Sequence, residues 1–347
     1  MKYSPTYISD IAKIWECVAG REQLAGKRML VTGSTGLIGS ALADTLLWAN
    51  KNRDADMCVL AAGRSREQVV KRFETYTEGT DYFFVPYDIN DVMPAVDVDY
   101  VLHIAGIANT TWYSAKPVET LLSTINSINT ILQHVRDRRG VRVLYVSSSE
   151  VYGNTDGKGP HEETMYGGSD ILNPRSCYSS AKQAAETLCA SYCREYDTDV
   201  VIARPGHVYG PTVNSNDARA SSVFPKQAAE GKQIVMKSAG MQLRSYCYVL
   251  DSISAMLTIL TKGKSGEAYN ISNSRSIVTI RQMAEAFAEA GGVSIRTEDA
   301  TETEKAGYNM MQNSSLDAKK LEALGWKGLF DMQTGATHTI EMLRYQK

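Results

Sequence analysis

Short apolar runs alternate with stretches of helical periodicity through the N-terminal part of the chain. Apolar strands separated by helices are typical of a parallel sheet that is covered on both faces. The expected strands are residues 28–31, 58–62, 82–85, 100–104, 141–146 and 200–203. The expected helices are residues 37–49, 64–74, 116–138 and 176–196. We therefore predict an α/β fold with a doubly wound parallel sheet.

The pattern differs at the two ends of the chain. Near the N-terminus, apolar residues fall at helical spacing, namely Ile8, Ile11, Ile14, Trp15 and Val18. We expect residues 1–26 to be an accessory segment whose short amphipathic helix packs on the domain that follows. After residue 205 the strict alternation fades, and the expected elements are helices at 222–231, 251–261, 279–290 and 316–324 and a strand at 268–271.

These changes suggest three parts. The predicted nucleotide-binding domain covers residues 27–205 and receives further strands from around 245–275. Residues 206–244 and 276–347 would form a smaller C-terminal substrate-binding lobe, interleaved with that domain.

The composition excludes several classes of protein. Of the 347 residues, 43% are hydrophobic, which supports a large core and argues against disorder. The formal net charge of −2 gives no reason to expect binding to nucleic acid or to a membrane surface. There is no signal-peptide core and no apolar run of ~18 residues, so we expect neither export nor a membrane span. The six cysteines lack metal-ligand spacing, which predicts free thiols, no metal site and a cytoplasmic location.

A glycine-rich turn, TGSTGLIG at residues 32–39, follows the first expected strand and opens a helix. Glycine permits a tight turn and lets the backbone approach a pyrophosphate, while the helix N-terminus supplies free N–H groups and the positive end of the dipole. We therefore predict a Rossmann-type dinucleotide site at this turn. Its candidate cofactor-binding residues are Gly33, Thr35, Gly36, Leu37, Ile38 and Gly39.

The end of the second expected strand bears on the choice between NAD and NADP. In NAD-binding folds an acidic residue usually stands there and holds the ribose hydroxyls. Here the strand ends in AAGRS at residues 61–65, without an acid. Arg64 and Ser65 could hold the 2′-phosphate of NADP, or Arg64 could stack on the adenine of NAD. The sequence leans only slightly toward NADP, so both cofactors stay open.

A second motif, YSSAK at residues 178–182, begins an expected helix after the strand at 141–146. Tyr178 and Lys182 are four residues apart and therefore share a helix face. An unperturbed phenol has a pKa of about 10, which a neighbouring ammonium and a cationic nicotinamide would lower. Tyr178 could then remove a hydroxyl proton while a hydride leaves the same carbon. Lys182 would also reach the nicotinamide ribose, and Ser148 would bind the same substrate oxygen as Tyr178.

The order of these motifs resembles the extended short-chain dehydrogenase/reductase family, in its nucleotide-sugar epimerase/dehydratase branch. The resemblance spans about residues 27–345. DIND at 88–91 is similar to the family's adenine-binding acidic motif, HIAG at 103–106 to its HxAA strand end, and residues 126 and 130 to its N-x-x-x-T helix face beneath the cofactor. The resemblance thus implies further cofactor contacts from Asp88, Ile89, Ala105, Gly106, Asn126, Val146, Pro205 and Val208.

The resemblance extends to the substrate. RPGHVYGP at 204–211 is similar to the family's R-x-x-N-x-Y-G-P segment, with His207 in place of a substrate-binding Asn. NDAR at 216–219 resembles a segment of UDP-glucuronate decarboxylases, and RSYCYVLD at 244–251 resembles the segment whose Arg binds the diphosphate. Arg219 and Arg244 could clamp the diphosphate, because Arg binds phosphate through paired N–H groups. The candidate substrate-binding residues are Ser148, Ser149, His207, Arg219 and Arg244. For His207, a simply packed imidazole is an equal alternative.

The reaction implied by the resemblance runs through a 4-keto sugar. The enzyme would oxidise the C4 hydroxyl of a nucleotide-diphosphate sugar with a tightly bound, recycled NAD or NADP. The resulting ketone acidifies C5 and labilises a C5 carboxylate. Glu150 joins Tyr178, Lys182 and Ser148 as a catalytic candidate, because decarboxylases and 4,6-dehydratases of this branch carry Ser/Thr-x-Glu there. Ser149 excludes the dehydratase class that needs an Asp between those two residues. The alternative for Glu150 is a carboxylate that merely positions Tyr178.

Three other functions stay open: a nucleotide-sugar 4-epimerase, a reductase of free 4-keto sugars, and a non-catalytic NAD(P)-sensing regulator. The complete set of Ser148, Tyr178 and Lys182 argues against the sensor, which has no need of it. The helices at 116–138 and 176–196 resemble those that pair in the family's four-helix dimer interface, so we expect a homodimer.

Some remaining residues have weaker signals. We expect His103, at a buried strand end, to be structural, and His161, in a polar loop, to be solvated. Trp112 and Tyr113 follow the fourth strand, where they could border the sugar or form a partly covered surface patch.

Overall fold

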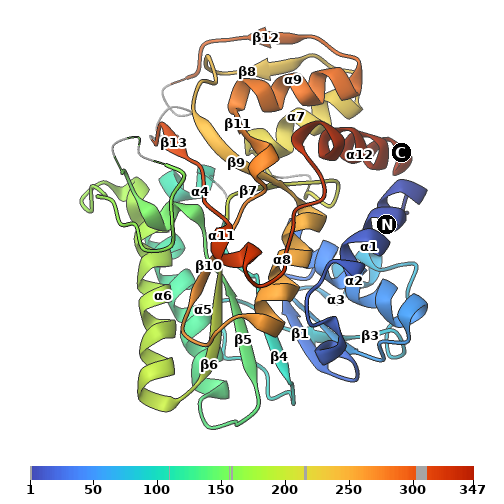
Figure 1. Ribbon diagram of the computed structural model, residues 1–347, viewed down its shortest axis with the longest axis vertical. Coiled ribbons are helices and arrows are strands. Elements are labelled where there is room, and N and C mark those ends of the chain that lie inside the picture. The colour runs from blue at the N-terminus through green and yellow to red at the C-terminus, as the bar shows by residue number, and fades with distance from the viewer. Residues whose placement is uncertain (1, 109, 156, 158, 215–216, 302–310) are drawn as a thin grey trace.

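The computed structural model describes residues 2–108, 110–155, 157, 159–214, 217–301 and 311–347. A large parallel sheet lies at its centre, and a smaller lobe covers one end (Figure 1). The strands of the large sheet are β1 (Arg28–Thr32), β2 (Cys58–Gly63), β3 (Tyr82–Pro86), β4 (Tyr100–His103), β5 (Arg142–Val146), β6 (Asp199–Pro205) and β10 (Ala268–Ile271). The helices around it are α1 (Pro5–Glu16), α2 (Leu37–Arg53), α3 (Arg66–Arg72), α4 (Thr110–Ala115), α5 (Pro117–Val135), α6 (Cys177–Tyr196) and α8 (Val249–Lys262).

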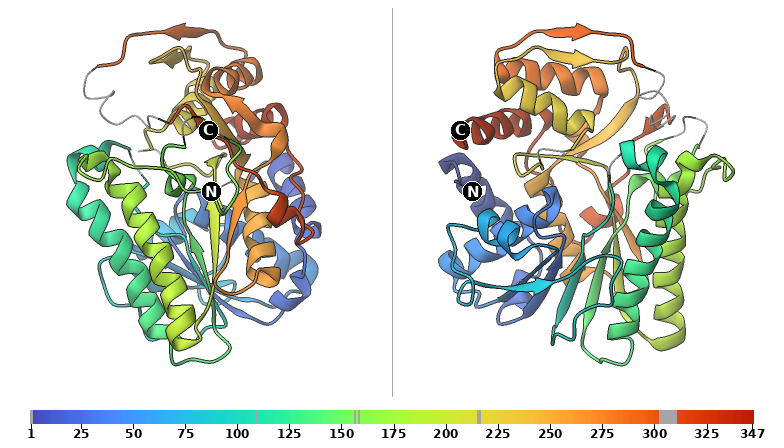
Figure 2. Two further views of the ribbon diagram at one scale, coloured as in Figure 1. Left: turned by 60° about the vertical axis from the view of Figure 1, so that its left-hand side comes forward. Right: turned by 180° about the vertical axis from the view of Figure 1, so that it is seen from behind.

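The large sheet is a doubly wound Rossmann sheet, as predicted. Its strand order is β10-β6-β5-β4-β1-β2-β3, and every pair is parallel. Successive side chains enter two different cores: Leu144 and Val146 of β5 pack on the side of α2 and α8, whereas Val143 and Tyr145 pack on the side of α5 and α6. Figure 2 shows the α5–α6 pair along one face of the sheet. This burial on both faces explains why the strands are apolar runs rather than alternating patterns.

The smaller lobe is built from short strands and three longer helices. Its strands are β7 (His207–Tyr209), β8 (Ile234–Met236), β9 (Leu243–Tyr248), β11 (Ile277–Thr279), β12 (Ile295–Thr297) and β13 (Asn313–Ser314). Its helices are α7 (Ala220–Ala229), α9 (Ile280–Gly291) and α12 (Met332–Tyr345), which pack against one another, while the short α11 (Lys319–Glu322) lies against β10.

Two predictions for the second half of the chain need correction. Of the strands expected to return from around 245–275, β10 joins the large sheet, but β9 pairs with β7, β11 and β13 in the lobe. The helix expected at 316–324 is reduced to α11. The long α12 was not predicted; it contains Gly335 and several threonines, which are weak helix formers, and its buried face stabilises it. None of the helices that the structure describes is long and apolar enough to span a bilayer.

The accessory segment contains the predicted amphipathic helix. α1 packs against α2, α8 and α12. The Tyr7 hydroxyl donates to Asp44 of α2 at 3.0 Å, and Asp10 lies 2.7 Å from the Nδ1 atom of His338 on α12. α1 thus ties the large sheet's helical layer to the lobe.

Candidate active site

The turn between β1 and α2 requires glycine at two positions. Gly33 has a φ of +67°, and a Cβ atom there would lie 3.0 Å from the backbone of Ala105. A Cβ atom on Gly39 would lie 2.2 Å from the Gly33 carbonyl oxygen. The start of α2 therefore lies directly against the end of β1, as the close approach of a helix to a nucleotide-binding turn demands.

The amino end of α2 suits an anion. Gly36 is its N-cap, and no side chain of the described residues caps this end. The first N–H groups of a helix have no partner within the helix, and the dipole is positive there. The predicted contacts Thr35, Leu37 and Ile38 surround this end, so the turn fits the pyrophosphate of a dinucleotide.

The residues expected at the adenosine end lie after β2 and β3. The Ser65 hydroxyl accepts a hydrogen bond from the Gln68 amide at 3.3 Å and caps α3. Asp88 accepts one from the Asn90 amide at 2.9 Å. Arg64 is exposed. Because Ser65 already serves as a helix cap, Arg64 is the more available of the two groups for a phosphate or an adenine ring.

Tyr178, Lys182 and Ser148 meet at the carboxyl end of β5. Tyr178 and Lys182 lie on α6, 8% and 6% exposed. Lys182 donates from Nζ to the Val146 carbonyl at 2.8 Å, and Nζ lies 5.9 Å from the centroid of the Tyr178 ring. Ser148 hydrogen-bonds to the Tyr178 side chain. The three groups proposed from the sequence thus form one cluster.

The pKa of Tyr178 differs in direction from the sequence expectation. Burial raises it, and the charge of Glu150 raises it further, whereas the hydrogen bond with Ser148 lowers it. The prediction that the pKa of Tyr178 is lowered is therefore wrong for the protein without its cofactor, because burial outweighs the neighbouring hydrogen-bond donors. The Lys182 amine does not offset burial, since it donates to the Val146 carbonyl. Burial also lowers the pKa of Lys182, to about 8.

Arg175 and Tyr113 complete this cluster. Arg175 donates from both terminal nitrogens to the two carboxylate oxygens of Glu150, at 3.2 and 3.3 Å. The Tyr113 ring stacks on Tyr178, with centroids 4.7 Å apart and an angle of 17°, and the Arg175 guanidinium lies 4.8 Å from the Tyr113 centroid. Tyr113 is 3% exposed and so is not part of a surface patch, whereas Trp112 is 37% exposed. Arg175 was not among the residues predicted from the sequence, although it lies only three residues before Tyr178.

The predicted substrate-binding residues include a buried, unpaired cation. Arg244 is 3% exposed, burial lowers its pKa, and its NH1 group donates to the Leu243 carbonyl at 2.9 Å. Among the described residues, no carboxylate forms an ion pair with it. Arg219, by contrast, pairs with Asp217 at 2.5 Å.

The positive charges of Arg244 and Arg219 both act on the imidazole of His207. Burial, Arg244 and Arg219 lower its pKa to about 3, so the imidazole is neutral. Its Nδ1 atom is buried and has no hydrogen-bond partner among the described residues. An unsatisfied polar atom of this kind is consistent with a group that meets a ligand. Asn216, in the motif before Arg219, lies outside the described residues.

The other candidates occupy mixed environments. Asn126 is exposed on α5. Val146, Ser149, Pro205 and Val208 are buried, Ile89 and Ala105 are half-buried, and Gly106 is exposed. In the parts of the chain that the structure describes, no cluster of three or more His, Cys, Asp or Glu side chains could hold a metal ion.

His103 and His161, the other two histidines considered from the sequence, are both structural. His103 lies between Thr32 and Ser127, with ring nitrogens 3.0 and 3.1 Å from their hydroxyls, and burial lowers its pKa to about 3. The expectation that His161 is solvated is wrong. Its ring is fully buried between the Thr155 hydroxyl at 2.6 Å and the Ser315 carbonyl at 2.8 Å, because the loop folds back onto the segment before α11.

Comparisons with known proteins identify the family of this chain. Residues 29–272 match the model of the NAD dependent epimerase/dehydratase family. The UDP-glucuronic acid decarboxylase 6 of Arabidopsis thaliana is 30% identical over 309 residues, which cover 89% of this chain and 86% of that protein. The dTDP-D-glucose 4,6-dehydratase of Homo sapiens is 26% identical over an alignment that covers 96% of this chain and 94% of that protein.

A solved structure shows the same fold with a cofactor present. The dTDP-glucose 4,6-dehydratase of Streptomyces venezuelae, solved with NAD bound, is 25% identical to this chain and superposes on it with a TM-score of 0.76. The superposition covers 92% of this chain and 97% of the solved chain. The match to an NAD-dependent family confirms the predicted resemblance, the enzyme class and the nicotinamide cofactor. This chain belongs to the NAD-dependent epimerase/dehydratase family.

Proposed function

We propose that this enzyme oxidises the C4 hydroxyl of a nucleotide-diphosphate sugar and then breaks a bond at C5 or C6 of the 4-keto product, as a decarboxylase or 4,6-dehydratase does. The observation that carries this proposal is the carboxylate of Glu150 beside Tyr178, held at both oxygens by Arg175. A 4-epimerisation needs no such acid, whereas elimination uses a base near C5. Relatives named decarboxylase and dehydratase support the same choice.

Each residue of the cluster has a distinct task in this proposal. Tyr178 takes the proton of the C4 hydroxyl, and Ser148 hydrogen-bonds to the same oxygen. Lys182 stabilises the Tyr178 phenolate and reaches the ribose beside it. NAD, held by the residues of the glycine turn, would supply hydride-transfer chemistry at C4. In a dehydratase Glu150 takes the C5 proton that the ketone acidifies, and in a decarboxylase it returns a proton to C5 after CO2 has left.

The glycine turn would hold the cofactor, with NAD as the form we propose first because the family is NAD-dependent. The contacts proposed from the sequence remain proposals for this chain, from the turn at 33–39 to Asp88 and Val208. The division into an accessory segment (1–26), a cofactor-binding domain (27–205) and a substrate-binding lobe (206–244 and 276–347) also remains a proposal.

Arg244 is the group we propose for the substrate diphosphate. A buried guanidinium without a carboxylate partner is costly, and an anionic ligand would offset that cost. His207, with its unsatisfied nitrogen, and Arg219 would add donors on the same side. The substrate is thus proposed to be a nucleotide-diphosphate sugar, as for relatives named for UDP- and dTDP-sugars.

Two further features stay proposals. A homodimer through α5 and α6 is supported by the exposed apolar residues Val118 and Leu122 on α5. A cytoplasmic location is supported by six cysteines that are all free thiols.

A 4-epimerase is the second candidate. It is favoured by the observation that both oxygens of Glu150 already bind Arg175. In an epimerase this carboxylate would only support the structure of the site and would not take part in proton transfer.

Mass spectrometry of the products separates these candidates. The protein is incubated with NAD or NADP and a panel of nucleotide sugars and nucleotide uronic acids. Loss of CO2 or of water supports the proposal and identifies the lyase. An isomer of unchanged mass would instead establish the epimerase, and absence of any conversion would overturn the proposal.

A further inference from the structure

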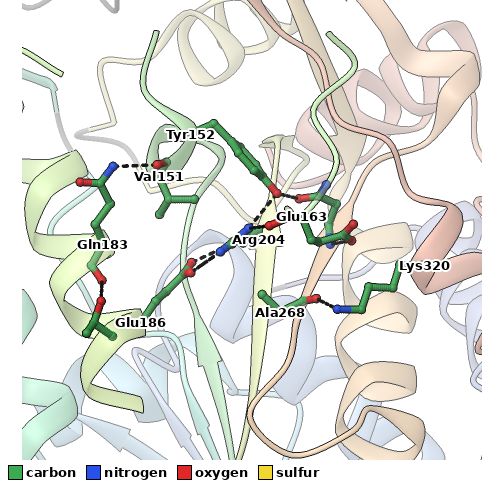
Figure 3. A network of polar contacts seen from close by, with 10 residues as sticks. Val151, Tyr152, Glu163, Gln183, Glu186, Arg204, Ala268 and Lys320 are labelled. Carbon is green, nitrogen blue, oxygen red and sulfur yellow. Dashed lines mark hydrogen bonds and ion pairs between the residues drawn. The ribbon is translucent and has the colours of Figure 1, made fainter. Parts of the chain in front are cut away.

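A buried ion pair lies one helical turn beyond Lys182. Tyr178, Lys182 and Glu186 occupy every fourth position of α6 and so share one face of that helix. Arg204, near the end of β6, donates to both oxygens of Glu186 at N–O distances of 2.6, 3.0 and 3.1 Å. The two side chains are 7% and 10% exposed. Figure 3 shows the pair bridging α6 and β6.

Arg204 is fixed in this position from its other side. Its NH1 group donates to the Tyr152 hydroxyl and to the Glu163 carbonyl, both at 3.0 Å, and the guanidinium lies 5.0 Å from the Tyr152 ring centroid (Figure 3). The Tyr152 hydroxyl donates in turn to the Asn270 side chain at 2.6 Å. Because the guanidinium is planar and its donors are rigidly spaced, these contacts direct its remaining edge at Glu186.

Lys182 lies next to this carboxylate without pairing with it. Its amine donates to the Val146 carbonyl at 2.8 Å instead. Glu186 raises the pKa of Lys182, but burial outweighs that effect and lowers it to about 8. The other titratable groups around Lys182 are uncharged near neutral pH, namely His103, Tyr145, Tyr178 and Cys189. Glu186 is therefore the anion, among the described neighbours, that could capture Lys182.

We propose that Arg204 is a positioning residue for the acid/base pair: by occupying both oxygens of Glu186, it prevents an ion pair between Glu186 and Lys182. The Lys182 amine is then left to Val146 and to Tyr178. The competition is direct, because side chains four residues apart on a helix are neighbours and opposite charges there attract each other. The role of this arrangement in catalysis rests on the proposed function, whereas the pKa of Lys182 can be measured without it.

Replacing Arg204 with Met frees the carboxylate. Glu186 should then pair with Lys182 and raise the pKa of Lys182 by about 1–3 units, as an opposite charge within a few ångströms does. Competitive acetylation with acetic anhydride over a range of pH, followed by mass spectrometry of the peptide that contains Lys182, measures this pKa on the full chain without substrate.

The double variant Arg204→Met/Glu186→Gln decides between positioning and simple structural support. It removes the competing carboxylate as well, so the pKa of Lys182 should return to the wild-type value. Because Glu186→Gln also removes the buried charge that Arg204→Met leaves uncompensated, the comparison rests on the pKa of Lys182 in folded proteins and not on stability. Glu186→Gln alone should leave the pKa of Lys182 at or below the wild-type value, because the Arg204 charge is then unneutralised.

Circular dichroism establishes that each variant is folded. If Arg204→Met does not fold, Arg204→Lys with and without Glu186→Gln makes the same comparison, since lysine keeps the buried charge but occupies fewer carboxylate sites. An unchanged pKa of Lys182 in the folded single variant, or an equal rise in single and double variants, overturns the proposal. Failure of the wild-type enzyme to convert any nucleotide sugar would overturn the proposed function instead, and the acetylation result would stand.

Discussion

The Arg175 guanidinium and the Glu150 carboxylate form a two-point ion pair, with N–O distances of 3.2 and 3.3 Å. The two side chains are only 15% and 19% exposed, so solvent screens the pair weakly. Glu150 also acts on Tyr178, whose pKa its charge raises. One carboxylate is therefore coupled both to the residue proposed to start the oxidation and to an arginine that fixes its direction.

Glu150→Gln should separate oxidation from elimination. The amide keeps the size of the side chain but can neither accept nor donate a proton, so formation of the final lyase product should fall by ~10²–10⁴-fold. Mass spectrometry should detect the 4-keto sugar in its place. Glu162→Gln, which changes an exposed carboxylate in a nearby loop, serves as the control and should leave turnover unchanged. Undiminished lyase product from Glu150→Gln would make this carboxylate a supporting residue.

The same substitution should change the pH dependence of the oxidation step. Because Glu150 raises the pKa of Tyr178, its removal should lower that pKa. A larger fraction of Tyr178 is then deprotonated at any given pH. The acidic limb of the pH profile for formation of the 4-keto sugar should move to lower pH, and Tyr178→Phe should abolish this activity in a folded protein. A limb that stays in place would show that another group controls it.

The fold could be predicted from the sequence where burial is two-sided. Strands such as β5 are continuous apolar runs, and their period distinguishes them from the helices between them. The lobe was harder, because β7, β8 and β11 are only three residues long and too short to show a period. α12 was missed because its stability comes from packing against α7 and α9 rather than from its residues' helix propensity.

The acid/base centre was predictable only in part, for a related reason. Tyr178 and Lys182 can be recognised from their helical spacing, which is a local property of the sequence. The pairing of Arg175 with Glu150, and the stacking of Tyr113 on Tyr178, join separate segments of chain that no local pattern connects. Burial likewise reversed the expected shift in the pKa of Tyr178, since the sequence reveals which charges are present but not how deeply a phenol is buried.

Gly39→Ala should weaken cofactor binding. Its Cβ atom would lie 2.2 Å from the Gly33 carbonyl, so the turn must move away from the start of α2. We expect the Kd for NAD to rise by at least about tenfold, which corresponds to ~1.4 kcal/mol. Isothermal titration calorimetry gives the Kd, and thermal unfolding verifies the fold. Gly168→Ala is the matched control, because a Cβ atom there meets no atom within 4 Å; equal affinities for the two variants would contradict the proposed role of the turn.

Arg244→Leu should weaken nucleotide binding without lowering stability. Arg244 is 3% exposed and has no carboxylate partner among the described residues, so the unliganded protein bears the cost of a buried charge. Leucine removes that charge and keeps most of the side-chain volume, so the Tm should be unchanged or higher. Charge-assisted hydrogen bonds contribute ~1.5–3 kcal/mol, which predicts a rise of roughly 10–150-fold in the Kd for a nucleoside diphosphate.

The exposed Arg296 on β12 provides the control for Arg244, because Arg296→Leu removes an equal charge from the surface. Calorimetry with UDP and dTDP, together with thermal unfolding, measures both quantities for both variants. If Arg244 were instead a structural cation, Arg244→Leu would lower the Tm, and affinity would fall only as far as the fold is lost. A decrease in affinity at constant or increased Tm therefore identifies a residue whose charge is retained for the ligand and not for the fold.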